Sequence, residues 1–214
     1  MQQSEIEKLV IQIKAIYAQK RYTFFERGDF NLNIIGIRED DIFDNTYSDT
    51  LIVLYKKAGV WQVLQMPWTT MPGTWGGVLS PITVFGITGT AVMKENQYRG
   101  LYQLIDNWTN VHKSPCFWQV KPMVVFRDGN KNFVFERDMP QQEGLFGINM
   151  HRMEGQYVNN WSIGCQGTNW VNFSKLVALA RIATNLYGSR FTYTLLHRED
   201  FKPTPKETKL KASK

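Results

Sequence analysis

Cysteine and histidine are scarce in this sequence of 214 residues, which contains two cysteines and three histidines. Two cysteines form at most one bridge, so a disulfide-stapled scaffold is excluded. The histidines, His112, His151 and His197, lie far apart and lack the spacing of a zinc site. We therefore expect no metal site and no cofactor.

Long apolar runs are also missing from the sequence. No stretch reaches the roughly 18 consecutive apolar residues expected of a membrane-spanning helix. The first residues lack the basic start, continuous apolar core and cleavage site of a signal peptide. We expect no membrane span, and synthesis as a cytoplasmic product without a signal peptide.

The composition is that of a globular protein, with 43% hydrophobic and 14% aromatic residues. The formal charge of +6 would attract nucleic acid, anionic lipid or a polyanionic cell wall, because net charge does not name the partner. No nucleic-acid-binding module or basic helix is present, so we expect no specific nucleic acid partner. Lysines crowd the end of the chain, and we interpret residues 199–214 as a basic, solvated tail.

Hydrophobic periodicity predicts a mainly β fold with flanking helices, of the α+β class. Residues 1–21 have apolar side chains at helical spacing, with a capping-box pattern at Ser4 and Glu7. A second helix is expected after Asn169, which would cap it, and before Gly188, which would end it. Strand-like stretches, rich in β-branched and aromatic residues, are 30–37, 50–55, 60–65, 90–93, 118–126, 133–135 and 190–196. We expect them to pair mostly in an antiparallel manner.

The stretch from Gly147 to Gln166 carries the candidate chemistry, because it contains both His151 and Cys165. A free thiol is mostly protonated at pH 7 and needs a neighbouring base before it attacks a carbonyl. Gly164 allows a tight turn that would leave backbone N–H groups uncovered beside the sulfur, as an oxyanion site requires. The alternative interpretation is that Cys165 is a core residue and His151 a satisfied polar group. A catalytic Cys165 would have to be a free thiol, and we expect Cys116 to be free as well.

Three motifs in this order resemble the catalytic domain of the L,D-transpeptidases, which act on peptides of the bacterial cell wall. They are the Ile-Asn-Met-His motif ending at His151, the Ser-Ile-Gly-Cys motif ending at Cys165, and an upstream Thr-Met-Pro-Gly segment, 70–73. Two stretches, 49–55 and 61–65, are similar to that family's opening hairpin. The resemblance spans roughly 49–196, within an expected catalytic domain of 22–198.

The resemblance implies that Cys165 attacks the carbonyl of the diamino-acid residue in a cell-wall stem peptide. His151 would act as base and then as acid, backbone N–H groups near Gly164 and Cys165 would hold the oxyanion, and Ser162 would orient the histidine or line the oxyanion pocket. The candidate substrate-binding residues are Arg152, Gln166, Tyr98, Arg99, His112 and Trp75. Tyr98, Arg99 and His112 have side chains suited to a carboxylate-bearing peptide, and Trp75 would line a groove.

The sequence departs from the family's usual pattern at three positions, which hold Arg152, Ile163 and Gln166 where glycine, histidine and arginine are usual. We interpret the chain as a divergent branch of the bacteriophage type. We expect hydrolysis rather than cross-linking, by an endolysin or a virion-associated peptidase, with phage structural proteins as possible partners. Such a protein would be made in the cytoplasm of the bacterial host and would act at the cell wall or in the virion. Two alternatives stay open: a non-catalytic peptidoglycan-binding structural protein of a phage particle, and a true L,D-transpeptidase.

Overall fold

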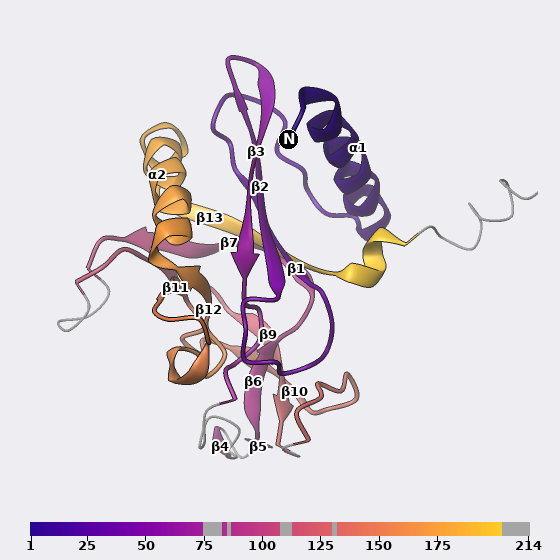
Figure 1. Ribbon diagram of the computed structural model, residues 1–214, viewed down its shortest axis with the longest axis vertical. Helices are drawn as coiled ribbons and strands as arrows, with labels where there is room; N and C mark the ends of the chain where they lie inside the picture. Colours follow the sequence, from indigo (N-terminus) through magenta and orange to yellow (C-terminus); the bar gives the residue numbers. More distant parts are fainter. Residues whose placement is uncertain (75–82, 85–86, 108–112, 130–131, 203–214) are drawn as a thin grey trace, which may run out of the picture.

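Strands dominate the structure, a computed structural model that describes residues 1–74, 83–84, 87–107, 113–129 and 132–202 (Figure 1). In chain order the elements are α1 (Gln3–Lys20), β1 (Asn33–Arg38), β2 (Asp49–Lys57), β3 (Val60–Trp68), β4 (Thr83–Val84), β5 (Ile87–Thr88), β6 (Thr90–Met93), β7 (Asn96–Ile105), β8 (Cys116–Gln119), β9 (Met123–Asp128), β10 (Gln141–Gly144), β11 (Met150–Met153), the 3-10 helix η1 (Asn159–Trp161), β12 (Gln166–Asn169), α2 (Trp170–Tyr187), β13 (Arg190–His197) and the 3-10 helix η2 (Arg198–Phe201). The predicted class, mainly β with flanking helices, is confirmed.

The main sheet has eight strands in the order β12-β11-β8-β7-β13-β1-β2-β3. Its two edge strands meet just beyond β3, where Thr69 forms an antiparallel bridge with Gly167. The Thr69 N–H donates to the Gly167 carbonyl at 2.9 Å, and the Gly167 N–H donates to the Thr69 carbonyl at 3.3 Å. This bridge turns the curved sheet into a nearly closed barrel. A smaller sheet, β10-β9-β6, adjoins it.

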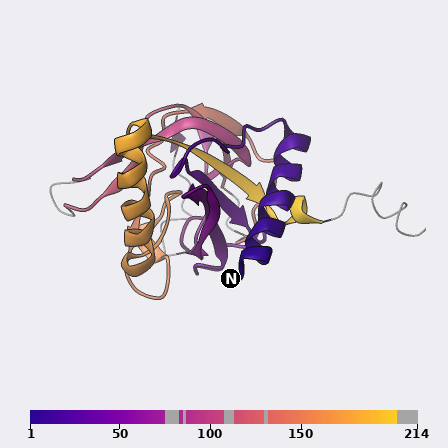
Figure 2. The same cartoon turned by 90° about the horizontal axis from the view of Figure 1, so that it is seen from above.

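The two helices cover opposite faces of the main sheet (Figure 2). Side chains alternate between the faces of a strand, and along β1 they divide accordingly. Ile34 belongs to the barrel core with α2, whereas Ile35 packs with α1. The buried side chains are Ile6, Val10, Ile13, Ile16 and Tyr17 on α1, and Phe173, Leu176, Val177, Ala180 and Ala183 on α2.

Both predicted helices are present, although the first begins with a different cap. Gln2 and Glu5, rather than Ser4 and Glu7, form the capping box of α1. The sequence pattern placed the cap two residues too late because Ser4 already lies within the first turn. For α2 the prediction is confirmed: the Asn169 side chain accepts from the Asn172 N–H at 3.0 Å, and the helix ends at Gly188.

The predicted strands need three corrections. The stretch 118–126 is two strands, β8 and β9, because the chain turns through Pro122, which has no N–H for a ladder. The stretch 133–135 makes only an isolated bridge between Val134 and Ile42. The ten-residue strand β7 was not predicted, since the charged and glycine-containing sequence around Arg99 resembles a loop.

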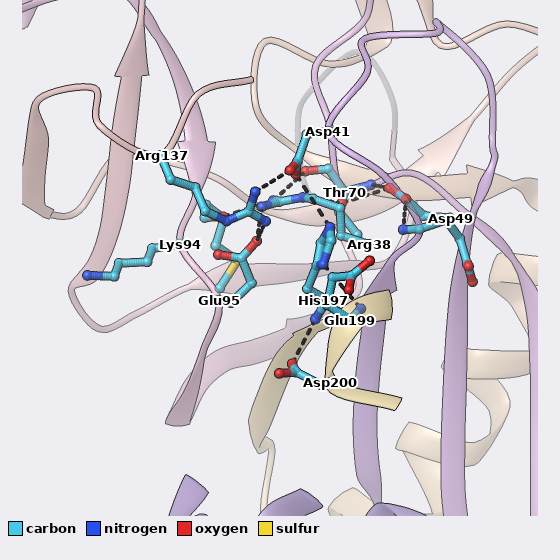
Figure 3. Close-up of polar contacts among 12 residues, drawn as sticks. Arg38, Asp41, Asp49, Thr70, Lys94, Glu95, Arg137, His197, Glu199 and Asp200 are labelled. Atoms are coloured by element: carbon cyan, nitrogen blue, oxygen red, sulfur yellow. Dashed lines mark hydrogen bonds and ion pairs between the residues drawn. The ribbon is translucent and has the colours of Figure 1, made fainter. Parts of the chain in front are cut away.

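A buried polar network supports the closure of the barrel (Figure 3). Arg38, 0% exposed, donates from Nη1 to Glu95 at 2.6 Å, from Nη2 to the Met93 carbonyl at 2.9 Å and from Nε to Thr70 Oγ1 at 3.1 Å. Asp49 accepts from the Thr70 N–H at 2.6 Å and from its hydroxyl at 2.7 Å. The network therefore fixes the position of Thr70, the residue that follows the Thr69–Gly167 bridge.

Burial acts to raise the pKa of both carboxyl groups of this network, but their net pKa shifts are opposite. Desolvation raises the pKa of Asp49, despite its hydrogen bonds to Glu39 and Thr70 and its attraction to Arg38. Desolvation also acts to raise the pKa of Glu95, but the positive charges of Arg38 and Arg137 outweigh it, and the net shift is downward. Glu95 is thus the ionised partner of the buried guanidinium.

We predict that Glu95→Gln lowers the free energy of unfolding by about 3 kcal/mol, because it leaves the buried Arg38 charge without its counter-ion. Urea denaturation at pH 7 measures this loss. Folding lowers the pKa of Glu95, so its stabilising contribution is present above its ordinary value of 4.5 and is lost as the pH falls through the folded-state pKa. The difference between wild type and variant should therefore shrink in acid.

The matched control is Glu26→Gln, which breaks the pair with Lys14 at 2.7 Å, where both side chains are more than 40% exposed. A surface pair contributes about 0–1 kcal/mol, so this variant should be nearly as stable as the wild type. Equal losses in the two variants would contradict the importance of the buried pair.

Candidate active site

His151 and Cys165 lie on neighbouring segments at one edge of the main sheet. Strand β11 runs parallel to β12, with Met150 opposite Gln166 and His151 opposite Gly167. Cys165 directly precedes β12, and the next N–H, of Gln166, donates to the Asn149 carbonyl at 2.8 Å. The structure therefore brings the predicted nucleophile and base to adjacent segments, two positions apart in register.

The His151 imidazole is buried, 1% exposed, and its orientation is fixed by the main chain. Its Nδ1 lies 2.7 Å from the Arg152 carbonyl oxygen. A carbonyl only accepts, so this contact requires the proton on Nδ1 and places the lone pair of the neutral ring on Nε2. This is the tautomer in which Nε2 acts as a base.

The Cys165 thiol is partly exposed and lies against the segment that leads into β11. Its Sγ accepts from the Asn149 N–H at 3.5 Å and donates to the Gly147 carbonyl at 3.5 Å. Desolvation raises the pKa of the thiol from 9.0 to about 11, against the lowering effect of the Asn149 N–H. Cys165 is therefore a neutral thiol at pH 7, and a base must take its proton when it attacks.

The turn before the thiol is held by Ser162. Its hydroxyl donates to the Cys165 carbonyl at 2.6 Å and accepts from the Gly164 N–H at 3.1 Å. Gly164 has φ +132°, and a Cβ there would lie 2.8 Å from the Ala91 carbonyl oxygen, so the position requires glycine. Ser162 thus occupies the Gly164 N–H, and of the two N–H groups expected to hold an oxyanion only that of Cys165 remains a candidate.

The upstream Thr-Met-Pro-Gly segment packs against this same turn. The Gly73 N–H donates to the Ser162 carbonyl at 3.0 Å. A Cβ at Gly73 would lie 1.9 Å from the Asn159 carbonyl oxygen, so only glycine allows this approach. Motifs separated by about half the chain thus meet beside Cys165.

Two of the expected substrate-binding residues are buried, which corrects those expectations. Gln166 is 0% exposed and belongs to the barrel interior, where its Oε1 accepts from Trp68 Nε1 at 3.4 Å and from the Tyr193 hydroxyl. Its Nε2 donates to Met93 Sδ at 3.2 Å. Tyr98 is also a core residue.

The remaining expected residues are distributed unevenly around the site. Arg152, next to His151, pairs with Glu154 at 2.9 Å and stacks over the Trp170 ring at 5.8 Å. Arg99 lies on β7, six residues before Ile105, the β7 residue that is level with His151. Six residues of a strand span about 20 Å, so the structure does not bring Arg99 to the site. His112 and Trp75 lie outside the described residues.

Sequence reasoning missed the main-chain groups that contact the thiol, the Gly147 carbonyl and the Asn149 N–H. Backbone atoms carry no residue-type signal, although the glycine at 147, with φ +69°, marks an unusual backbone there. It also missed Gln119 and the exposed Trp118 of β8, the strand that pairs with β11. Neither residue belongs to a recognisable motif.

We predict that Cys165 is alkylated by iodoacetamide more slowly than an unperturbed cysteine below pH 9. A pKa of about 11 instead of 9.0 makes the thiolate fraction there about 100-fold smaller, since each pKa unit is a factor of ten. The rate should keep rising tenfold per pH unit up to pH 10. Mass spectrometry on the Cys116→Ala variant isolates the Cys165 signal, and a plateau near pH 9 would contradict the raised pKa.

Comparisons with known proteins do not identify this site: no family model, curated protein or solved structure matches the chain. In the described ranges, no group of three or more histidine, cysteine, aspartate or glutamate residues is arranged to hold a metal ion. Likewise, no helix in these ranges has the length and apolarity needed to cross a membrane. Residue chemistry and geometry alone characterise the site.

Proposed function

We propose that the protein is a cysteine-dependent acyl-transfer enzyme that acts on peptidoglycan stem peptides. The observation that carries this proposal is the parallel pairing of β11 with β12, which places His151 and Cys165 on adjacent segments. The contact of His151 Nδ1 with the Arg152 carbonyl supports it further, because it presents Nε2 as the basic nitrogen.

In the proposed reaction, Cys165 Sγ attacks the carbonyl carbon of a peptide bond while its proton passes to His151 Nε2. The Cys165 N–H stabilises the negative charge on the carbonyl oxygen, and one such donor contributes about 3 kcal/mol to the transition state. The C–N bond then breaks, His151 protonates the leaving amine, and a thioester remains. Water releases the acid, whereas an amine forms a cross-link.

The state of the thiol distinguishes two versions of this chemistry. A preformed thiolate–imidazolium pair requires a lowered thiol pKa, but burial raises that of Cys165 to about 11. General-base catalysis, with proton transfer during attack, fits a neutral thiol. We therefore expect substrate binding, rather than resting-state ionisation, to start the reaction.

The substrate class and setting rest on the resemblance of the motifs together with the charge. The formal charge of +6 would hold the protein near a polyanionic cell wall. The usual arginine after the nucleophile is replaced by Gln166, which faces the barrel interior, so we favour water over an amine as acceptor. This combination suits a phage endolysin or a virion-associated peptidase, the latter with phage structural proteins as partners.

A second candidate function is favoured by the raised pKa of Cys165, since a binding protein needs no reactive thiol. In this case the chain would be a structural protein of a phage particle that binds peptidoglycan without cleaving it. A true L,D-transpeptidase is the third candidate, and it differs from the first only in the acceptor of the acyl group.

We predict that the wild type shortens purified muropeptides and that Cys165→Ala abolishes the products. His151→Gln should reduce the rate by about 10²- to 10⁴-fold, as expected for loss of a general base. The matched control is Cys116→Ala, which removes the other thiol, on the strand next to His151. Mass spectrometry of the products and of a thioester on Cys165 gives the readout.

The products separate the three candidates. Shortened peptides indicate hydrolysis, and joined peptides indicate transpeptidation. Unchanged muropeptides, together with equal binding of wild type and Cys165→Ala to whole sacculi, would overturn the enzymatic proposal and leave the structural protein.

A further inference from the structure

Gln119, the last residue of β8, uses every hydrogen-bonding position of its side chain. It is 4% exposed. Its Oε1 accepts from the Phe146 N–H at 3.0 Å and the Ile148 N–H at 3.1 Å. Its Nε2 donates to the carbonyls of Lys121 at 2.9 Å and Gly144 at 3.0 Å. A carboxamide has two lone pairs and two protons for such bonds, so the group is saturated.

These bonds hold the connection 145–149, which joins β10 to β11 and belongs to neither strand. Outside a ladder, a segment depends on side chains or water to satisfy its backbone groups. Gln119 supplies three such bonds within 144–148 from its side chain. Its own N–H adds a fourth contact, to Asn149 Oδ1 at 2.8 Å.

The same connection supplies both groups that contact the thiol. The Gly147 carbonyl lies between the two residues whose N–H groups bind Gln119, and the Asn149 N–H follows immediately. The Asn149 N–H favours the thiolate, whereas the Gly147 carbonyl accepts only from the protonated thiol. The position of this segment therefore determines how the sulfur is held.

We propose that Gln119 is a positioning residue of the candidate active site, fixing the 144–149 segment and thereby the direction and hydrogen bonding of the Cys165 thiol. This deepens the proposed function and rests on it for the catalytic consequence. The effect on the thiol itself is independent of activity. Gln119 touches neither Sγ nor substrate, and it acts through the main chain of Gly147 and Asn149.

The test is Gln119→Met, which keeps the length of the side chain and removes the four hydrogen bonds of its carboxamide group. Once the segment is released, the partly exposed sulfur becomes better hydrated, and the desolvation that suppresses its ionisation is relieved. We expect alkylation of Cys165 at pH 8 to become about tenfold faster, which corresponds to one pKa unit. Turnover of muropeptides should fall on the order of 100-fold through kcat, because the nucleophile is displaced.

The matched control is Gln97→Met. The Gln97 carboxamide also holds a connecting segment, the one between α1 and β1. It accepts from the Thr23 N–H at 2.8 Å and donates to the Thr23 carbonyl at 2.8 Å. It lies at the opposite end of β7 from the site. This variant should lose stability without any change in Cys165 alkylation or kcat.

A second variant, Gln119→Glu, tests the same role if Gln119→Met does not fold. Its carboxylate still accepts from Phe146 and Ile148 but no longer donates to Lys121 and Gly144, so a smaller acceleration of alkylation is expected. Wild-type alkylation in either folded variant would overturn the positioning role, whether or not the protein is an enzyme. If the wild type does not act on muropeptides, only the proposed function fails, and the alkylation result still decides the role of Gln119.

Discussion

The pair of backbone hydrogen bonds between Thr69 and Gly167 is the constraint on which the candidate site depends. It joins the two edges of an eight-stranded sheet and sets where β12 lies relative to β3. Gly167 also stands opposite His151, and a Cβ at Gly167 would lie 2.1 Å from the His151 carbonyl oxygen. No larger residue fits at this short distance. Closure of the barrel and placement of the His151 imidazole therefore depend on the same glycine.

Inside the barrel, Gln166 specifies the register of this closure. Its carboxamide binds Trp68 on one edge strand, Tyr193 on a central strand and Met93 of the smaller sheet. A shift of one residue would turn Gln166 outward, direct Cys165 into the core and leave the buried indole and phenol without partners. A polar group in the core therefore determines which residue of the turn is presented to solvent.

The elements of the fold that depend on local sequence patterns could be predicted, whereas those that depend on contacts between distant residues could not. Both helices were predictable because caps and apolar spacing act over a few residues, as with Asn169 and Gly188. His151 and Cys165 could be singled out because their residue types and the motifs around them are visible in the sequence, whereas the parallel pairing of β11 with β12 was not predicted. The order of the eight strands depends on contacts between distant residues. The face occupied by Gln166 and the supporting role of Gln119 depend on that order, and residue type did not reveal them.

The desolvation of the Cys165 thiol has a consequence for the lifetime of the protein. Peroxide attacks thiolates, and the resulting sulfenic acid can progress to irreversible forms. A thiol with its pKa raised to about 11 remains almost wholly protonated in oxygenated surroundings at neutral pH. Under the proposed function, in which Cys165 is a nucleophile that meets its substrate at a cell wall, outside a reducing compartment, this protonation would protect the sulfur against oxidation until a base takes its proton.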